Sequence, residues 1–166
     1  MSQWKWLRMV VVGAVFLTNQ AFALNLLQIG NISNFTLGTW GISDPAISRY
    51  MDVCVYSVGD LIAQGKYSIT ISSPNGFKLT SGANTLSYSL FWEDAGPGVL
   101  GSTSGVELFN GVALNNQNNA SILSPLCSLG ITGPTARLTL KITKANLIAA
   151  VAGNYSGTIT LLIAPA

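Results

Sequence analysis

Few side chains of this chain could do chemistry, and their types limit what that chemistry could be. The sequence holds two cysteines, six carboxylates and no histidine. Zinc sites draw on histidine and cysteine, and a catalytic serine or cysteine needs a general base that is usually histidine. Glu93 and Asp94 are neighbours, so on a strand they point to opposite faces and predict a solvated strand end, not an acid–base pair. We therefore expect no enzymatic activity, no metal site and no cofactor.

The N-terminal residues have the three parts of a secretory signal. Lys5 and Arg8 form a basic start, Met9 to Leu17 is a short apolar run, and Ala21-Phe22-Ala23 is a small-x-small cleavage site. The apolar run is shorter than the roughly 20 residues that a membrane-spanning helix needs. We predict that residues 1–23 are a cleaved signal peptide. The alternative is a retained N-terminal membrane anchor.

The remaining residues, 24–166, have the length of a single domain and a balanced charge. Removing Lys5 and Arg8 from the eight basic residues of the chain leaves six, against six acidic residues. Surfaces that bind nucleic acid or anionic lipid need an excess of basic side chains. We expect no nucleic-acid partner and, after cleavage, no membrane insertion.

Cys54 and Cys127 are the only cysteines, and an even count in an exported chain predicts one disulfide bond. Closing a loop of this size would stabilise the fold by about 4 kcal/mol on the chain-entropy model. A metal-binding or catalytic role for the two thiols is the alternative, which the absence of histidine disfavours.

Alternation of apolar and polar residues predicts β-strands through most of the domain. Lys66 to Ser72 and Arg137 to Thr143 alternate strictly, and the segment from Leu86 to Trp92 repeats the same period. Met51 to Ser57 is apolar enough to lie in the middle of a sheet. Short strands separated by turns rich in glycine, proline and asparagine predict an all-β, Ig-like antiparallel sandwich.

The other segments are predicted to connect strands. Lys144 to Val151 contains helix formers and is followed by Gly153, which predicts a two-turn helical connector. Asp94 to Gly105 and Asn115 to Asn119 have the composition of loops. Gly96 to Gly101 matches the spacing G-x-G-x-x-G, but no helical run follows it. We therefore interpret it as part of a loop and not as a dinucleotide site.

The last predicted strand is expected to border an open groove. Tyr155, Ile159, Leu161 and Ile163 alternate along it and therefore share one face. The other predicted strands look too few to cover both of its edges. A long apolar strand with an open edge is a template for pairing with another chain. The alternative is a closed sandwich in which this strand is central.

Two motifs resemble those of chaperone–usher pilus subunits. Gly153 to Leu161 is similar to the G-x-Y-x-G terminus found in spore coat U domains of archaic pili and in colonisation-factor type fimbrial subunits. Asn34 to Trp40 resembles the N-F-G first strand of spore coat U domains, with Thr36-Leu37 inserted. The resemblance extends over essentially all of 24–166. The chain departs from it in having no cysteine near the first strand, where these domains commonly carry one.

The resemblance implies an incomplete Ig-like domain that lacks its final strand and is completed by a strand from another subunit. The four residues named above for the last strand would border the strand-acceptor groove. Leu24, Leu26 and Ile29 would belong to the donor segment, which is short in this chain. The expected function is therefore that of a minor or tip-proximal subunit, structural or adhesive, in a bacterial surface pilus.

The same resemblance implies the partners and the location. The partners would be a periplasmic chaperone, an outer-membrane usher and neighbouring pilus subunits. The chain would pass through the periplasm and reach the cell surface as part of a pilus.

A second function class stays open beside the pilus subunit. The chain could be a self-complete extracellular Ig-like module that binds a glycan or a protein. Trp92 and the loop from Asp94 to Gly105 would then form the binding surface.

Overall fold

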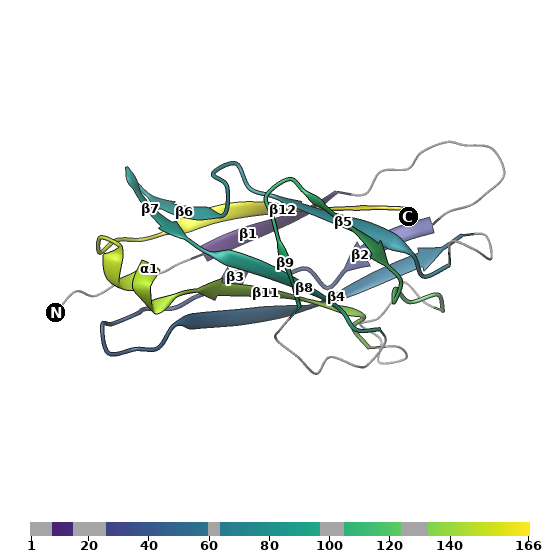
Figure 1. The fold of residues 1–166 in the computed structure, drawn as a ribbon, viewed down its shortest axis with the longest axis horizontal. Coiled ribbons are helices and arrows are strands. Elements are labelled where there is room, and N and C mark those ends of the chain that lie inside the picture. Colours follow the sequence, from purple (N-terminus) through teal and green to yellow (C-terminus); the bar gives the residue numbers. More distant parts are fainter. Residues whose placement is uncertain (1–7, 15–25, 60–63, 97–104, 124–132) are drawn as a thin grey trace.

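The computed structural model describes residues 8–14, 26–59, 64–96, 105–123 and 133–166 (Figure 1). These residues form two facing β-sheets with one short helix at one end, which confirms the predicted all-β sandwich. Nearly all pairs of neighbouring strands are antiparallel, and the pair β1–β12 is parallel.

The first sheet has the strand order β10-β5-β12-β1-β3, and β6 pairs with both β12 and β7. Its strands are β1 (Arg8–Ala14), β3 (Phe35–Thr36), β5 (Tyr67–Ser72), β6 (Lys78–Ser81), β7 (Asn84–Ser87), β10 (Ala113–Gln117) and β12 (Ser156–Ala164).

The second sheet has the strand order β2-β4-β11-β8-β9. Its strands are β2 (Leu26–Gly30), β4 (Ile47–Val58), β8 (Ser89–Asp94), β9 (Val106–Leu108) and β11 (Ala136–Ile142). The predicted central position of the strand around Met51 to Ser57 is confirmed, because β4 pairs with β2 on one side and with β11 on the other.

The core lies between the two sheets and is built from the alternate residues that the sequence pattern picks out. The inward residues of β5 and β11 are fully buried: Tyr67, Ile69, Ile71, Leu138, Leu140 and Ile142. Since successive residues of a strand point to opposite faces, one face of each strand enters the core and the other faces outward.

The segment from Leu86 to Trp92 forms two strands in different sheets, although its alternation predicted a single strand. β7 pairs with β6 in the first sheet, whereas β8 pairs with β11 and β9 in the second. Tyr88 lies at the change of sheet, and its backbone N–H donates to the carbonyl of Phe77 (3.0 Å). The alternation continues through the bend because inward residues of both sheets face the same core.

The helical connector is confirmed, and one predicted loop is wrong for part of its length. Helix α1 spans Lys144–Ala149, and the Thr143 hydroxyl caps it by accepting from the N–H of Asn146 (3.2 Å). The segment from Asn115 to Asn119 was predicted as a loop, but Ala113–Gln117 forms strand β10 beside β5. An outermost strand can carry exposed amide side chains. Strand β10 therefore lacks the alternating apolar residues by which the other strands were predicted.

Asp94 is a half-buried residue at the end of β8, and it joins the two sheets at one end of the sandwich. The Tyr67 hydroxyl of β5 donates to Asp94 Oδ1 (2.7 Å), and Trp92 Nε1 donates to the same hydroxyl (3.2 Å). Asp94 Oδ2 accepts from the backbone N–H groups of Asn118 (2.9 Å) and Asn119 (3.2 Å). Burial, and then the Asp94 charge, raise the pKa of Tyr67, which keeps its hydroxyl protonated as the donor.

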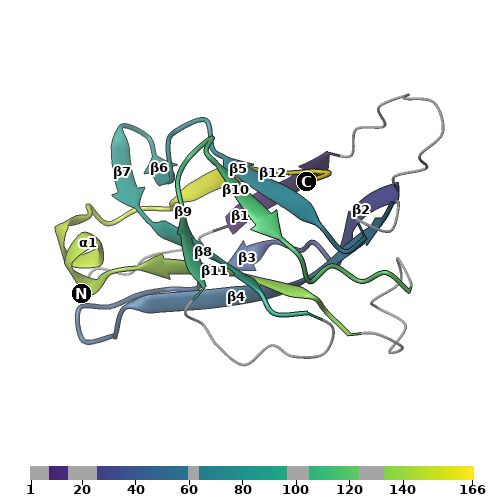
Figure 2. The same cartoon turned by 45° about the vertical axis from the view of Figure 1, so that its right-hand side comes forward.

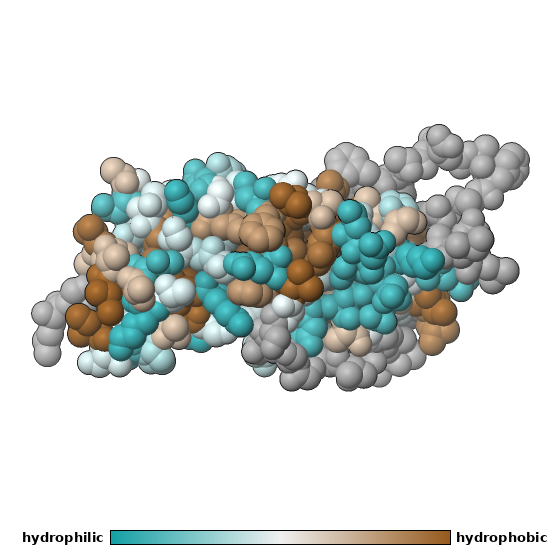
Figure 3. Space-filling model, viewed as in Figure 1, coloured by the Kyte–Doolittle hydropathy of each residue, from teal (hydrophilic) through white to brown (hydrophobic). Residues whose placement is uncertain are grey.

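The face of the molecule drawn in Figure 3 mixes polar and apolar side chains. The most exposed large apolar residues come from separate parts of the chain: Leu123 (81 % exposed), Ile42 (72 %) and Phe109 (63 %). Single apolar residues are common on protein surfaces, and we assign no function to them.

Replacing Asp94 should destabilise the full chain markedly. Asp94→Ala leaves the buried Tyr67 hydroxyl without its acceptor and frees the loop amides, at an expected cost of about 2–4 kcal/mol. Glu107→Ala removes an exposed carboxylate from β9 and should change stability by less than about 0.5 kcal/mol. Urea denaturation of both variants measures the difference, and equal midpoints would contradict the bridging role.

Candidate strand-acceptor site

The inward face of β12 matches the residues predicted for the groove. Tyr155, Ile159, Leu161 and Ile163 are all buried, the first three completely, whereas Thr158 between them is exposed. These four apolar side chains belong to the core cluster of the sandwich. The predicted face of the last strand is therefore correct.

The predicted open edge of β12 is not open in the full chain. On one side β12 pairs with β5 and β6, and on the other side its residues 156–162 pair with all seven residues of β1. Figures 1 and 2 both show β1 (purple) running beside β12 (yellow). The open edge was predicted for residues 24–166 without the signal peptide, whereas β1 comes from residues 1–23.

β1 lies between β12 and β3, and we name this position the acceptor slot. Residues 8–14 pair in parallel with residues 156–162 of β12, without a shift in register. Arg8 and Met9 also pair antiparallel with Thr36 and Phe35 of β3. Within the described residues, β1 is thus the only strand that joins β12 to β3.

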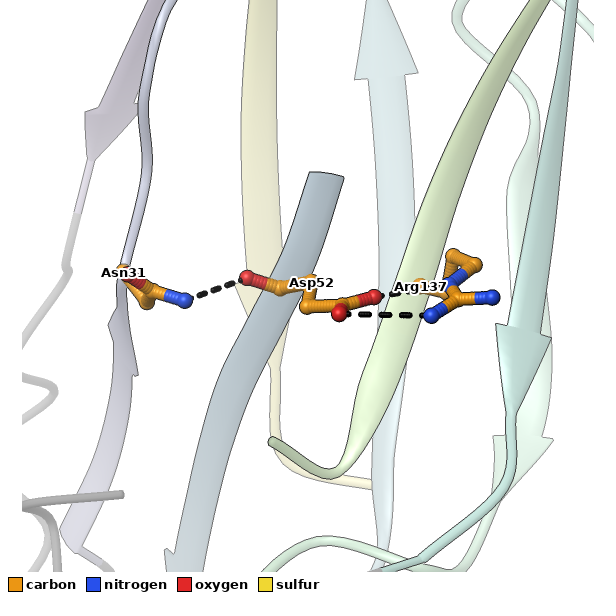
Figure 4. Close-up of polar contacts among 3 residues, drawn as sticks. All are labelled: Asn31, Asp52 and Arg137. Atoms are coloured by element: carbon orange, nitrogen blue, oxygen red, sulfur yellow. Dashed lines mark hydrogen bonds and ion pairs between the residues drawn. The ribbon is translucent and has the colours of Figure 1, made fainter. Parts of the chain in front are cut away.

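The far border of the acceptor slot is set where the chain leaves the second sheet. β2 pairs with β4 in that sheet, and the chain then passes to β3 in the first sheet. Asn31 lies at this crossing with a positive φ of 61°, and its Nδ2 donates to the Asp52 carbonyl (2.7 Å). Arg137 of β11 donates to both Asp52 carboxylate oxygens (2.7 and 3.2 Å). Figure 4 shows Asn31 bonded to the backbone carbonyl of Asp52 on β4, and Arg137 of β11 bonded to the carboxylate of the same residue.

Gly157 allows a close approach of β6 to β12. A Cβ atom at this position would lie 2.9 Å from Leu79 Cδ2, so a larger residue would force Leu79 of β6 to move. Gly157 is registered with Met9 of β1. The glycine in the C-terminal motif therefore has a packing reason within this chain.

The predicted donor segment lies inside the chain's own second sheet. Leu26 and Ile29 belong to β2, which pairs with β4 along five residues. Leu27 is buried and Leu26 is exposed, so the face of β2 that carries Leu27 is the one that points to the core. Leu24 lies outside the described residues. In this structure the segment is therefore not a free extension that could reach another subunit.

The disulfide stays a prediction, but the chain on both sides of Cys127 lies close to Cys54. Cys54 is buried on the face of β4 opposite its core neighbour Val55, and Cys127 lies outside the described residues. Before that segment, the Ser121 N–H donates to the Val55 carbonyl (2.8 Å). After it, the Thr135 hydroxyl accepts from the Val55 N–H (2.8 Å). Both flanks of the Cys127 segment are therefore fixed next to Cys54.

The surface predicted for the alternative ligand-binding module does not include Trp92. This side chain is 1 % exposed and donates to the Tyr67 hydroxyl inside the core. Most of the loop from Asp94 to Gly105 lies outside the described residues.

The described residues contain no cluster of three or more histidine, cysteine, aspartate or glutamate side chains arranged to hold a metal ion. Among the same residues, no helix combines the length and apolar character that crossing a membrane requires. Comparison with known proteins adds no assignment, because neither a family model nor a curated protein matches the chain.

Two substitutions on β12 separate its inward from its outward face. Ile159→Asp places a carboxylate at a fully buried position and should cost the full chain about 3–5 kcal/mol. Thr158→Asp makes the neighbouring change at an exposed position and should cost less than about 1 kcal/mol. Thermal unfolding of both variants tests this, and a larger loss from Thr158→Asp would reverse the assignment of faces.

The cysteine pairing can be tested on protein purified under oxidising conditions. Peptide mapping without reductant should recover one cross-linked fragment that contains Cys54 and Cys127. Replacing both residues by serine should lower the free energy of unfolding by about 4 kcal/mol. Two free thiols in protein from the periplasm would show that the prediction is wrong.

Proposed function

We propose that this chain is a minor or tip-proximal subunit of a bacterial surface pilus, with a structural or adhesive role, and that a partner's strand fills its acceptor slot in the fibre. One observation carries the proposal. The strand that covers the second edge of β12 comes from residues 8–14, which lie inside the predicted signal peptide.

Removal of residues 1–23 would leave two strands of the first sheet with unpaired edges. β12 would lose its ladder partner over seven residues, and β3 would lose its only neighbour among the described strands. Unpaired N–H and C=O groups beside a buried apolar face are costly and invite pairing with another chain. A strand supplied by a partner would restore both ladders.

The proposed sequence of events follows the export of the chain. The signal peptide is removed, a Cys54–Cys127 disulfide forms in the periplasm, and a periplasmic chaperone lends a strand to the slot. An outer-membrane usher then passes the subunit to a neighbouring subunit, whose strand takes the place of the chaperone's. The role needs no catalysis, cofactor, nucleic acid or inserted membrane segment, and its final location is the pilus on the cell surface.

The self-complete binding module is the second candidate, and one observation favours it. β12 is paired on both sides within its own chain. This candidate requires a sandwich that is stable without a strand from another chain, whereas the pilus subunit requires a slot that a partner's strand fills.

The stability of protein that lacks residues 1–23 distinguishes the two candidates. For a pilus subunit we expect aggregation or no cooperative unfolding when this protein is purified alone, because the slot is empty. A monomer that refolds reversibly with several kcal/mol of stability would contradict the pilus proposal and favour the self-complete module.

Immunogold labelling of the producing bacterium tests the location. We expect label on surface fibres, sparse or at their ends for a minor subunit, and loss of that label in Ile159→Asp cells. Thr158→Asp cells should keep it, because that side chain faces away from the core. Label found only in the medium, on protein of monomer size, would contradict the proposal.

A further inference from the structure

The seven residues of β1 fit the acceptor slot as a continuous strand. Every residue from Arg8 to Ala14 has a registered partner on β12, from Ser156 to Leu162. The first two also pair with β3, so β1 bridges both borders of the slot. An apolar segment that touched the sheet by chance would not be expected to pair in continuous register with one strand and also to pair with a second strand.

The composition of β1 favours an extended strand. Its middle is the run Met9-Val10-Val11-Val12, and β-branched residues such as valine prefer strands over helices. Only residues 15–25 separate β1 from β2, which is itself paired with β4. A strand tethered this closely competes with free strands at a high effective concentration.

We propose that the uncleaved chain is closed in cis. Residues 8–14 occupy the place that a partner's strand would take, parallel to β12, and so keep that partner out until the N-terminal segment is removed. This inference rests on the proposed function and adds a regulatory step to it. The export signal is then also the first occupant of the slot, and cleavage before or during folding decides whether the slot opens.

A second consequence concerns the segment itself. Residues 8–14 cannot pair with β12 and β3 while an export apparatus holds them. In a precursor that has folded with β1 in place, the signal segment is therefore not accessible to the export apparatus. In a precursor that is being exported, the slot is empty.

Hydrogen exchange on the purified full chain tests the pairing directly. The backbone amides of residues 156–162 should exchange slowly, because β12 lies between two strands. Val10→Pro and Val11→Pro, made separately, each remove one N–H of β1. Since the N–H groups of successive residues alternate between the two sides of a strand, one of the variants loses a bond to β12. In that variant exchange at 156–162 should be at least about tenfold faster.

Matched controls separate opening of the slot from general unfolding. Gln3→Pro introduces proline outside β1 and should leave exchange in β12 unchanged. In the β1 variants, the amides of β11 should keep their protection, because β11 pairs with β4 and β8 in the other sheet. Equal exchange of β12 in the unsubstituted chain and both β1 variants would overturn the inference.

A cysteine pair decides the matter where a proline variant fails to fold. Val10 is registered with Thr158, which is exposed. The full chain with Val10→Cys and Thr158→Cys should form a cross-link between these residues on mild oxidation, identified by mass spectrometry. Val10→Cys with Thr160→Cys is two residues out of register and should cross-link at least about tenfold less. Equal cross-linking of both pairs would overturn the proposed register.

A labelled peptide with the sequence of residues 8–14 tests whether the slot is closed to other strands. It should bind the opened proline variant at least about tenfold more tightly than the unsubstituted chain, and the same residues in reverse order should bind less. Equal binding to both chains would overturn closure in cis, and fibre labelling would still decide the pilus proposal. Closure in cis together with absence of the protein from fibres would overturn the pilus proposal alone.

Discussion

A β-strand inside a sheet has two edges, and each edge must find a partner for its backbone N–H and C=O groups. In this chain that requirement is concentrated on β12. Its inward residues Ile159 and Leu161 are fully buried in the core, so the strand cannot move to the surface to satisfy an unpaired edge with water. β5 and β6 cover one edge, and the other depends on β1 alone. The completeness of the sandwich therefore depends on seven residues near the N-terminus.

Local pattern was sufficient to predict much of the fold. Period-two alternation identified the buried faces of β5, β11 and β12, because a residue's side of the sheet follows directly from its position along the strand. Helix formers after Ile142 identified α1 for a similar reason, since a short helix is specified by its own residues. The inward positions of Tyr155, Ile159, Leu161 and Ile163 were predicted in the same way, because each residue had only to be assigned to one face.

Features that depend on distant partners were missed. The alternation from Leu86 to Trp92 is unbroken, so nothing local shows that the chain changes sheets at Tyr88. The polar strand β10 is held by its pairing with β5, and its amide side chains gave no apolar signal. The partner of β12 was missed because an apolar run after two basic residues fits both an export signal and a buried strand. Only the three-dimensional arrangement shows that residues 8–14 fit beside residues 156–162.

The parallel pair β1–β12 also imposes an order in time on the life of the chain. Arg8 and its registered partner Ser156 are separated by 148 residues of sequence. At roughly 5–20 residues per second, β12 leaves the ribosome roughly 7–30 s after β1. Throughout that interval β12 is absent, and the N-terminal segment can pair only through Arg8 and Met9 with β3. If the chain is exported as proposed, the long separation of the two strands delays self-closure until after the N-terminal segment has become available for recognition.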